Sequence, residues 1–261
     1  MVALFQFTVV SLCLAAGPLQ GRTQHDLQPF KNGGVVIEDG GYWLSTWSGR
    51  TRVPIKELSE WQVNSTCFDH RRRRVVFSDR DGDLRQLSLV DGKVSKLGLD
   101  KVGAFTMSPN GKQIAACRYG PGSESPNVLA LWTERTGKVR ILARDRRRAT
   151  LTSPSFSADG QEVAYCTEIY PESRRSSYVT AIDLATSRKR YPFGRDPWNG
   201  RALFGKGREM VLEWYGSEER DIAIYVGRSS SSLVRLSGRR VEERLLAVDQ
   251  RSGRIVFDKP Y

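Results

Sequence analysis

The stretch "MSPNGKQIAAC" at residues 107–117 and the stretch "FSADGQEVAYC" at residues 156–166 follow the same pattern. Each has an apolar residue, a short turn sequence with Gly, and then a run of apolar residues that ends in Cys. Asn or Asp followed by Gly is typical of tight turns, because Gly adopts a positive φ without strain. Each stretch therefore predicts two antiparallel strands joined by a tight turn.

Three weaker copies of this pattern occur elsewhere in the chain, namely "FDHRRRRVVF" from Phe68, "LFGKGREMVL" from Leu203 and "VDQRSGRIVF" from Val248. The copies recur with a period of about 45 residues, which is typical of a β-propeller in which each repeat forms a four-stranded blade. In the two best copies the second strand is apolar on both sides, as a sheet packed between two other sheets requires.

A second alternating hairpin follows four of the five copies and supplies the third and fourth strands. These hairpins are "LRQLSLVDGKVSKL" (84–97), "VLALWTERTGKVRIL" (128–142), "YVTAIDLATSRKRYPF" (178–193) and "IAIYVGRSSSSLVRL" (222–236). The copy from Val248 lacks such a hairpin, whereas the hairpin at 42–58 has no copy before it. We therefore expect an all-β, five-bladed propeller of four-stranded antiparallel blades, closed by a composite blade from both termini, since closure removes an exposed sheet edge.

The two best copies, together with "LALWTERTGKVRIL" (129–142) and "AIDLATSRKRYPF" (181–193), resemble the Ser-Pro-Asp-Gly repeat of the TolB-like β-propeller family. The same repeat occurs in the propeller domains of prolyl oligopeptidases. The resemblance spans about residues 35–261 and is degenerate in the other three copies. It implies a propeller fold and a tendency towards noncatalytic protein binding outside the cytoplasm. Five blades depart from the six usual in TolB-type propellers and the seven of the peptidases, and no hydrolase domain follows.

The N-terminal residues predict export. Residues 1–16 are mostly apolar, with small residues at Cys13 and Ala15 that suit signal-peptide cleavage, although no Lys or Arg precedes them. A buried N-terminal strand is the alternative, and the run is too short for a membrane span. We expect a signal peptide at 1–16, a linker at 17–34 and the propeller at 35–261, in a periplasmic or secreted monomer without stable membrane insertion.

No cofactor or metal is expected. Cys67, Cys117 and Cys166 remain after the signal peptide, and their spacing matches neither a disulfide framework nor a zinc site. The segment "DRDGDL" at 79–84 has the acids of a calcium loop, but such a loop would need Gly where Leu84 stands. An Asp-Gly turn between two strands is the favoured interpretation.

The sequence predicts no catalysis. On the expected inner strands the only acids are Glu242 and Glu243, and adjacent strand residues point to opposite faces, so they do not form the facing pair of a glycosidase. His25 and His70 are the only histidines, and no GxSxG motif is present. A carbohydrate-binding or glycoside-hydrolase-like five-bladed propeller remains the alternative function.

Charge is the remaining signal, since 41 Lys and Arg stand against 29 Asp and Glu, giving a formal net charge of +12. Nucleic acid is not expected as a partner, because no regular aromatic side chains interleave with the Arg runs and export separates the protein from cellular nucleic acid. We expect the propeller face that carries the first-to-second and third-to-fourth strand turns to be basic, and to bind an acidic protein or an anionic envelope polymer. The candidate binding residues are Arg71, Arg72, Arg73, Lys112, Lys138, Arg188, Lys189, Arg208 and Arg254.

Overall fold

The structure is a computed structural model, and it describes residues 33–38, 41–46, 51–145, 149–169 and 176–192, together with six strands between residues 200 and 260. Side chains are described only as far as residue 192. The described residues are strands and connecting turns, apart from one turn of 3-10 helix, η2 (Lys56–Leu58). The all-β prediction is therefore confirmed.

Four sheets each have four antiparallel strands in chain order, and we number these blades I to IV. Blade I is β4 (Ser65–Asp69), β5 (Arg74–Ser78), β6 (Leu84–Ser88) and β7 (Val94–Lys96). Blade II is β8 (Val102–Met107), β9 (Gln113–Tyr119), β10 (Pro126–Thr133) and β11 (Lys138–Arg144). Blade III is β12 (Ala149–Phe156), β13 (Glu162–Ile169), β14 (Ser176–Asp183) and β15 (Lys189–Arg190). Blade IV is β16 (Gly200–Phe204), β17 (Met210–Tyr215), β18 (Ile222–Gly227) and β19 (Val234–Arg235).

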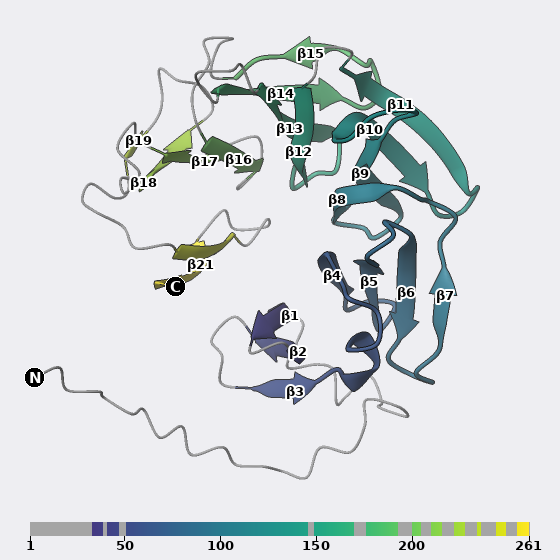
Figure 1. Cartoon of the computed structure of the whole chain (residues 1–261). Coiled ribbons are helices and arrows are strands. Elements are labelled where there is room, and N and C mark those ends of the chain that lie inside the picture. Colours follow the sequence, from purple (N-terminus) through teal and green to yellow (C-terminus); the bar gives the residue numbers. More distant parts are fainter. Residues whose placement is uncertain are drawn as a thin grey trace, which may run out of the picture.

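The blades are arranged around a ring, with the first strand of each blade nearest the centre (Figure 1). The first strands β4, β8, β12 and β16 contact one another in that order. All five sequence copies form the antiparallel hairpin that they predict. The chain is thus a β-propeller.

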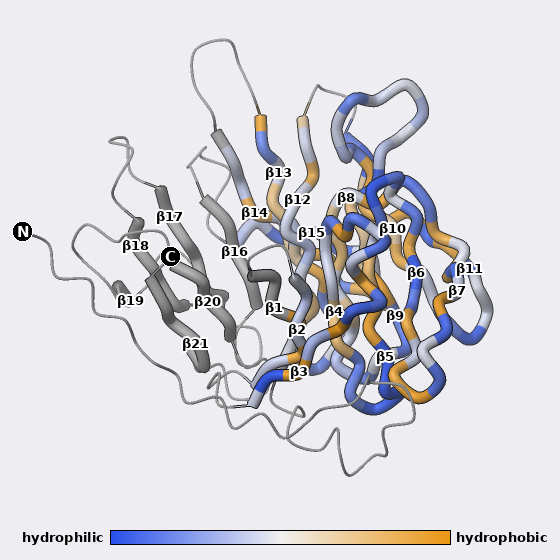
Figure 2. The backbone as a smooth tube through the Cα atoms, turned by 60° about the horizontal axis from the view of Figure 1, so that its bottom comes forward, coloured by the Kyte–Doolittle hydropathy of each residue, from blue (hydrophilic) through white to orange (hydrophobic). Residues whose placement is uncertain are grey.

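The apolar core lies between the sheets, because the second strands bury side chains on both faces. Val75 and Phe77 pack with the N-terminal strands, whereas Val76 between them packs with blade II. In β9, Ala115 and Cys117 face blade III in the same manner. Apolar segments run along the strands and the turns are hydrophilic (Figure 2). This two-sided burial agrees with the sequence prediction.

The ends of the chain differ from the prediction. The N-terminal sheet has three strands, β1 (Gly33–Glu38), β2 (Gly41–Thr46) and β3 (Arg52–Pro54), and the C-terminal sheet has two, β20 (Arg244–Val248) and β21 (Ile255–Pro260). The two sheets are not hydrogen-bonded to each other in the described part of the chain. The structure therefore has four complete blades rather than five.

The reason for the difference is β1, a strand that the sequence analysis did not predict. This strand pairs with β2 along its whole length and contacts β4, so it occupies the inner position of the N-terminal sheet. It takes the edge of β2 beside which β21, the second strand of the last copy, would have paired in a composite blade. In Figure 1, β21 lies between blade IV and the N-terminal sheet around the ring. Residues 1–32, which include the predicted signal peptide, lie outside the described residues.

Candidate docking face

The first-to-second and third-to-fourth turns of blades I to III lie together on one face of the propeller, which we call the turn face. One backbone hydrogen bond joins the two turns in each blade. It runs from Leu89 N to Arg73 O in blade I, from Glu134 N to Lys112 O in blade II and from Leu184 N to Gln161 O in blade III, over 2.8, 3.0 and 2.8 Å. The predicted site residues of these blades therefore share a face.

A buried ion cluster joins blades I and II on this face. Arg74, which is 5% exposed, donates from Nε to Asp69 Oδ2 over 3.1 Å and from Nη1 to Glu134 Oε1 over 2.7 Å. Its Nη1 also donates to Gln86 Oε1 over 2.5 Å. Because Glu134 belongs to blade II and the other three residues to blade I, this cluster, which we call the I–II clamp, holds the two blades together.

Arg72 extends the clamp. Its guanidinium donates to Asp69 Oδ2 over 3.1 Å and to the carbonyl oxygen of Gly111 over 2.8 Å, and it forms a salt bridge with Glu134 at 2.9 Å. The sequence analysis assigned Arg72 to partner binding. The structure gives this side chain three contacts within the protein, so it acts at least in part as an inter-blade link.

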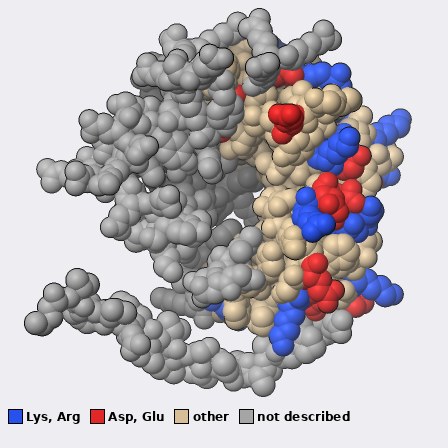
Figure 3. Space-filling model, viewed as in Figure 1, with Lys and Arg blue, Asp and Glu red and all other residues tan. Residues whose placement is uncertain are grey.

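The other predicted site residues fall into two groups. Arg71, Lys112, Lys138, Arg188 and Lys189 are exposed, Arg73 is half-buried with a positive φ of 50°, and none of these six has an ion pair in the described part of the chain. Arg208 and Arg254 lie outside the described residues. Along the outer part of the ring seen in Figure 3, basic and acidic side chains adjoin one another. The described part of the surface in this view is therefore mixed in charge rather than purely basic.

The next junction, between blades II and III, has the same backbone plan but different side chains. The pairing of the second and third strands shows which residues of blades I, II and III occupy equivalent positions. At this junction the clamp residues are replaced by Gln113 for Arg74, Leu131 for Gln86, and Leu184 for Glu134. These replacements remove the ion cluster.

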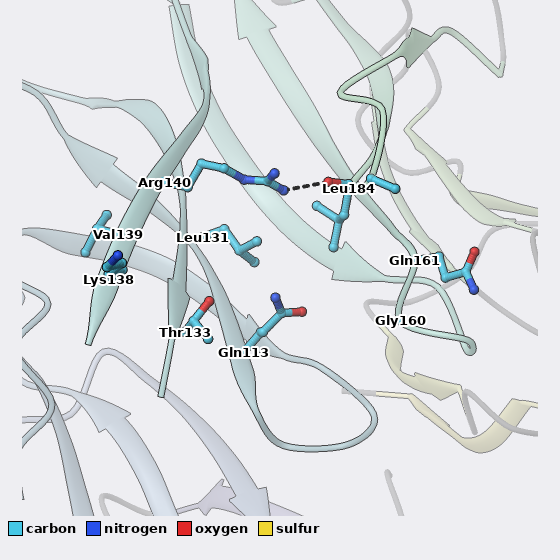
Figure 4. A pocket seen from close by; sticks show the side chains of 10 residues that line it. Gln113, Leu131, Thr133, Lys138, Val139, Arg140, Gly160, Gln161 and Leu184 are labelled. Atoms are coloured by element: carbon cyan, nitrogen blue, oxygen red, sulfur yellow. Dashed lines mark hydrogen bonds between the residues drawn. The ribbon is translucent and has the colours of Figure 1, made fainter. Parts of the chain in front are cut away.

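An open pocket of about 670 Å³ lies at this second junction, and we call it the II–III groove (Figure 4). Its apolar lining includes Leu131 and Leu184, and its polar lining includes Gln113, Lys138 and Gln161. Arg140, from β11, reaches across the groove and donates from Nη2 to the carbonyl oxygen of Leu184 over 2.8 Å. This contact links blades II and III while leaving the rest of the guanidinium without an ion pair in the described part of the chain. The groove thus combines an apolar floor with hydrogen-bond donors and positive charge.

The opposite face holds the segment with calcium-like acids. Asp79 Oδ1 accepts from the backbone N–H groups of Asp81 and Asp83, and Asp79 Oδ2 accepts from Arg85 Nε over 2.6 Å. Gly82 has a φ of 79° and donates to the carbonyl oxygen of Asp79. The segment is therefore the Asp-Gly turn between β5 and β6, as predicted. Lys96 and Arg85 hold the pKa of Asp83 below its usual value, the hydrogen bond from Lys96 being the largest cause.

The three cysteines of the propeller are free thiols. Burial raises the pKa of Cys67 to about 11, and the nearby Asp69 carboxylate adds to this effect. Burial raises the pKa of Cys117 further. Since the thiolate is the reactive form, the thiols of Cys67 and Cys117 stay protonated and unreactive at neutral pH. Glu242 and Glu243, the acids considered for glycan cleavage, lie outside the described residues.

Comparisons with known proteins address the fold. No protein-family model matches the chain, and no curated protein matches its sequence. A solved structure of TolB from Acinetobacter baumannii is similar, with a TM-score of 0.63 and 12% sequence identity over 82% of this chain and 54% of TolB. What they share is the propeller fold. This chain therefore spans about half the length of TolB.

Enzymes share the fold too. The tricorn protease is similar with a TM-score of 0.55 and 12% identity, over 82% of this chain and 26% of the protease. An oligogalacturonate lyase from Vibrio parahaemolyticus is similar with a TM-score of 0.51 and 11% identity, over 70% of this chain and 54% of the lyase. Because identity is so low and one fold hosts many functions, these similarities show the fold alone. In the described residues, no helix has the length and apolar character that crossing a bilayer requires.

The sequence analysis missed the II–III groove and the role of Glu134. Both follow from differences between the repeats, whereas the predicted fold and face depend on what the repeats share. A sequence alignment of the third-to-fourth turns of blades II and III would have aligned Glu134 with Leu184. An alignment of the starts of the second strands of blades I and II would have aligned Arg74 with Gln113.

Proposed function

We propose that this protein is a noncatalytic binding scaffold that docks an acidic protein surface or another anionic partner on its turn face. The observation that carries the proposal is the contrast between cations on that face. The guanidiniums of Arg72 and Arg74 are neutralised within the clamp, whereas Arg71, Lys112 and Lys189 are exposed and have no ion pair in the part of the chain that the structure describes. Because no ion pair neutralises these exposed side chains, their electrostatic field can act on a partner.

Electrostatic attraction of this kind acts mainly on the rate of association. Several like charges on one face raise the local potential and steer an anionic partner, and salt weakens the effect because the Debye length is only about 8 Å at physiological ionic strength. Each exposed pair adds about 1 kcal/mol or less to affinity. The proposal therefore predicts binding that depends strongly on salt.

The test uses poly-glutamate as an acidic probe. The variant Arg71→Glu/Lys112→Glu/Lys189→Glu reverses three exposed charges and spares the clamp residues Arg72 and Arg74. We expect slower association at low salt and a smaller dependence on salt, with an unchanged thermal midpoint. Arg80→Glu is the matched control, because Arg80 is 68% exposed and lies on the opposite face, in the turn that follows β5. Equal capture and equal salt dependence in the triple variant and the wild type would refute the proposal.

The absence of catalysis is part of the same proposal. A glycan-cleaving propeller is the competing function, and Glu242 and Glu243 are the acids that it would use. We expect purified protein to leave polysaccharides uncleaved. Hydrolysis that is lost in Glu242→Gln or Glu243→Gln would overturn the scaffold proposal and favour the competing one.

We also propose that the protein is exported, and that its two terminal sheets close the ring together. The apolar residues 1–16 support export, and the position of β21 between blade IV and the N-terminal sheet supports closure (Figure 1). N-terminal sequencing of protein from the periplasm or medium should find residues 1–16 removed. Deleting residues 246–261 should lower the cooperativity of unfolding, and a deletion variant that unfolds like the full chain would contradict closure.

A further inference from the structure

We propose that the II–III groove binds an extended acidic peptide segment of a partner protein. The segment places an aliphatic side chain against Leu131 and Leu184 and its carboxylates beside Lys138 and Arg140. This proposal rests on the docking function above and gives it a specific site. Three features of the groove carry it, namely its apolar floor, its donors without acidic partners, and the strand at its edge.

The apolar floor is the first feature. Leu131 is 3% exposed and belongs to the core between blades II and III, and Leu184 packs against the same core from the other blade. At the I–II junction the equivalent positions hold Gln86 and Glu134, which bind Arg74. With the leucines in place, the space of about 670 Å³ is lined by an apolar floor large enough for a branched aliphatic side chain.

The donors are the second feature. The Arg140 guanidinium has five N–H donors, and within the described part of the protein it donates from Nη2 to Leu184 O. Lys138 is exposed at the rim, and its ammonium has no ion pair in the described residues. By contrast, Arg72, Arg74 and Arg190 each pair with a carboxylate. Two cations beside an apolar floor, without an acid of their own, complement a ligand that carries both carboxylates and an aliphatic group.

The strand at the edge is the third feature. β11 is the outermost strand of blade II and has seven residues, whereas the outermost strands of blades I, III and IV have three, two and two. It pairs with β10 along one side. Val139 and Ile141 on this strand are 41% and 46% exposed. A long edge strand with exposed apolar residues pairs readily with an added strand unless charges prevent it.

The charges on β11 determine which kind of strand can pair with its free edge. β11 carries Lys138, Arg140 and Arg144, and it carries no acid. These cations repel a basic or like-charged strand, including a second copy of β11, and attract an acidic one. Leu131 pairs with Arg140 and Thr133 with Lys138, so the apolar floor and the two cations lie on the same face of the sheet. An extended segment presents every second side chain to that face, and it fits the groove when those side chains include both acidic and aliphatic ones.

The test fills the groove without changing the charge of the protein. Gln113→Arg/Leu184→Glu places the clamp pair of the I–II junction at the II–III junction, and its two charges cancel. The probe is a fluorescein-labelled heptapeptide, Ser-Glu-Ser-Leu-Ser-Glu-Ser, matched in length to β11, and we call it the Glu-Leu probe. In an extended conformation its two Glu side chains and its central Leu point to the same face. We expect the wild type to bind this probe and the double variant to bind it about tenfold more weakly or worse, as measured by fluorescence anisotropy. Circular dichroism and a thermal midpoint no lower than that of the wild type show that the variant is folded.

A second variant and two further probes make the outcome specific. Arg140→Gln removes the central cation and keeps a donor for Leu184 O, and we expect it to weaken binding by about fivefold. A Lys-Leu heptapeptide and a Glu-Ser heptapeptide should both bind more weakly than the Glu-Leu probe, since one lacks the charge and the other the aliphatic group. Equal affinity of the wild type and both variants for the Glu-Leu probe would overturn the groove proposal.

The failure of this proposal can be told apart from failure of the docking function. If the Glu-Leu probe responds only to Arg71→Glu/Lys112→Glu/Lys189→Glu, the basic face binds anions without using the groove, and the groove proposal falls while the docking function stands. If neither poly-glutamate nor the heptapeptide binds at low salt, both fall. Loss of heptapeptide binding in the groove variant with retained poly-glutamate capture supports both.

Discussion

The I–II and II–III junctions of this propeller are built from the same repeat, yet one is closed by charge and the other is open. At the first, Arg74 lies buried between Asp69 and Glu134. At the second, Gln113 and Leu184 occupy the equivalent positions and leave a groove of about 670 Å³. Three replacements within a common backbone, Gln113 for Arg74, Leu131 for Gln86 and Leu184 for Glu134, therefore distinguish an inter-blade contact from a candidate binding site.

The comparison also separates two uses of arginine. A guanidinium that is buried with two carboxylates neutralises them and fixes the position of neighbouring blades, and its removal leaves buried charge behind. A guanidinium at an open junction, such as that of Arg140, keeps most of its donors for a ligand. A count of cations, on which the sequence prediction of a basic face depended, does not distinguish these two situations.

The largest expected effect belongs to Arg74. Arg74→Leu leaves the buried carboxylate of Asp69 and the half-buried carboxylate of Glu134 with Arg72 as their remaining cation, which costs about 3 kcal/mol of unfolding free energy. Gln113→Leu is the matched control at the equivalent position of blade II, and it should cost about 1 kcal/mol or less, because it leaves no buried charge unpaired. Urea unfolding measures both. Similar losses in the two variants would show that the junctions are energetically alike.

A smaller effect measures the link between Arg72 and Glu134. The side chain of Arg72 is 34% exposed, so solvent weakens its salt bridge. A double-mutant cycle of Arg72→Gln and Glu134→Gln should give a coupling of about 0.5–1 kcal/mol. The corresponding cycle of Arg140→Gln and Leu184→Ala should give none from charge, since the contact runs to a backbone oxygen. Zero coupling in the first cycle would remove Arg72 from the clamp and return it to the candidate binding residues.

The pH dependence of stability probes the thiol beside the clamp. The folded pKa of Cys67 is raised from 9.0 to about 11, so its contribution to stability is complete below pH 9.0 and is lost as pH rises towards 11. Cys67→Ala should therefore lose about 1 kcal/mol less stability than the wild type between about pH 8 and about pH 10. Chemical denaturation at the two pH values provides the measurement. Parallel losses in both proteins would mean that Cys67 is not shielded at the I–II junction.

An effect of similar size concerns the turn of blade I. Arg73 adopts a φ of 50°, whereas blade II places Gly111 at the last position of its turn, with a φ of 70°. Arg73→Gly should raise the free energy of unfolding by about 0.5–1 kcal/mol, because a side chain is strained in this region. Arg71→Gly, at a position without a positive φ, is the control and should not stabilise the protein. A destabilising effect of Arg73→Gly would indicate that the Arg73 side chain contributes to the clamp.

Much of the fold could be predicted because the same sequence pattern occurs in five copies along the chain. We could predict the propeller, the strand order and the two-sided core from the turns at Gly111 and Gly160 and from the apolar second strands. The prediction failed at the N-terminal sheet, where β1 lacks the repeat pattern. Asp39 and Gly40 stand between two apolar runs there, a sequence typical of a hairpin, but no strand was predicted for the run before them.

The site was harder to predict because it depends on pairs of residues from different blades. Arg72 and Glu134 are distant in sequence, and only the ring brings the first turn of blade I to the third-to-fourth turn of blade II. The groove depends on the same kind of pair, Gln113 with Leu184, and on the absence of charge at both positions. Sequence patterns within one repeat therefore identified the turn face, whereas the distinction between its closed and open junctions required the structure.

Mapping the site of peptide contact tests most directly whether the open junction is the binding site. The Glu-Leu heptapeptide, carrying a photoreactive group at its central Leu, would be cross-linked to the wild-type protein and the attached residues found by mass spectrometry. We expect cross-links within β11 and around Gln161 and Leu184, and we expect them to disappear in Gln113→Arg/Leu184→Glu. Cross-links concentrated around Arg71 and Arg73 at the I–II junction, unchanged in that variant, would contradict the assignment of binding to the II–III groove.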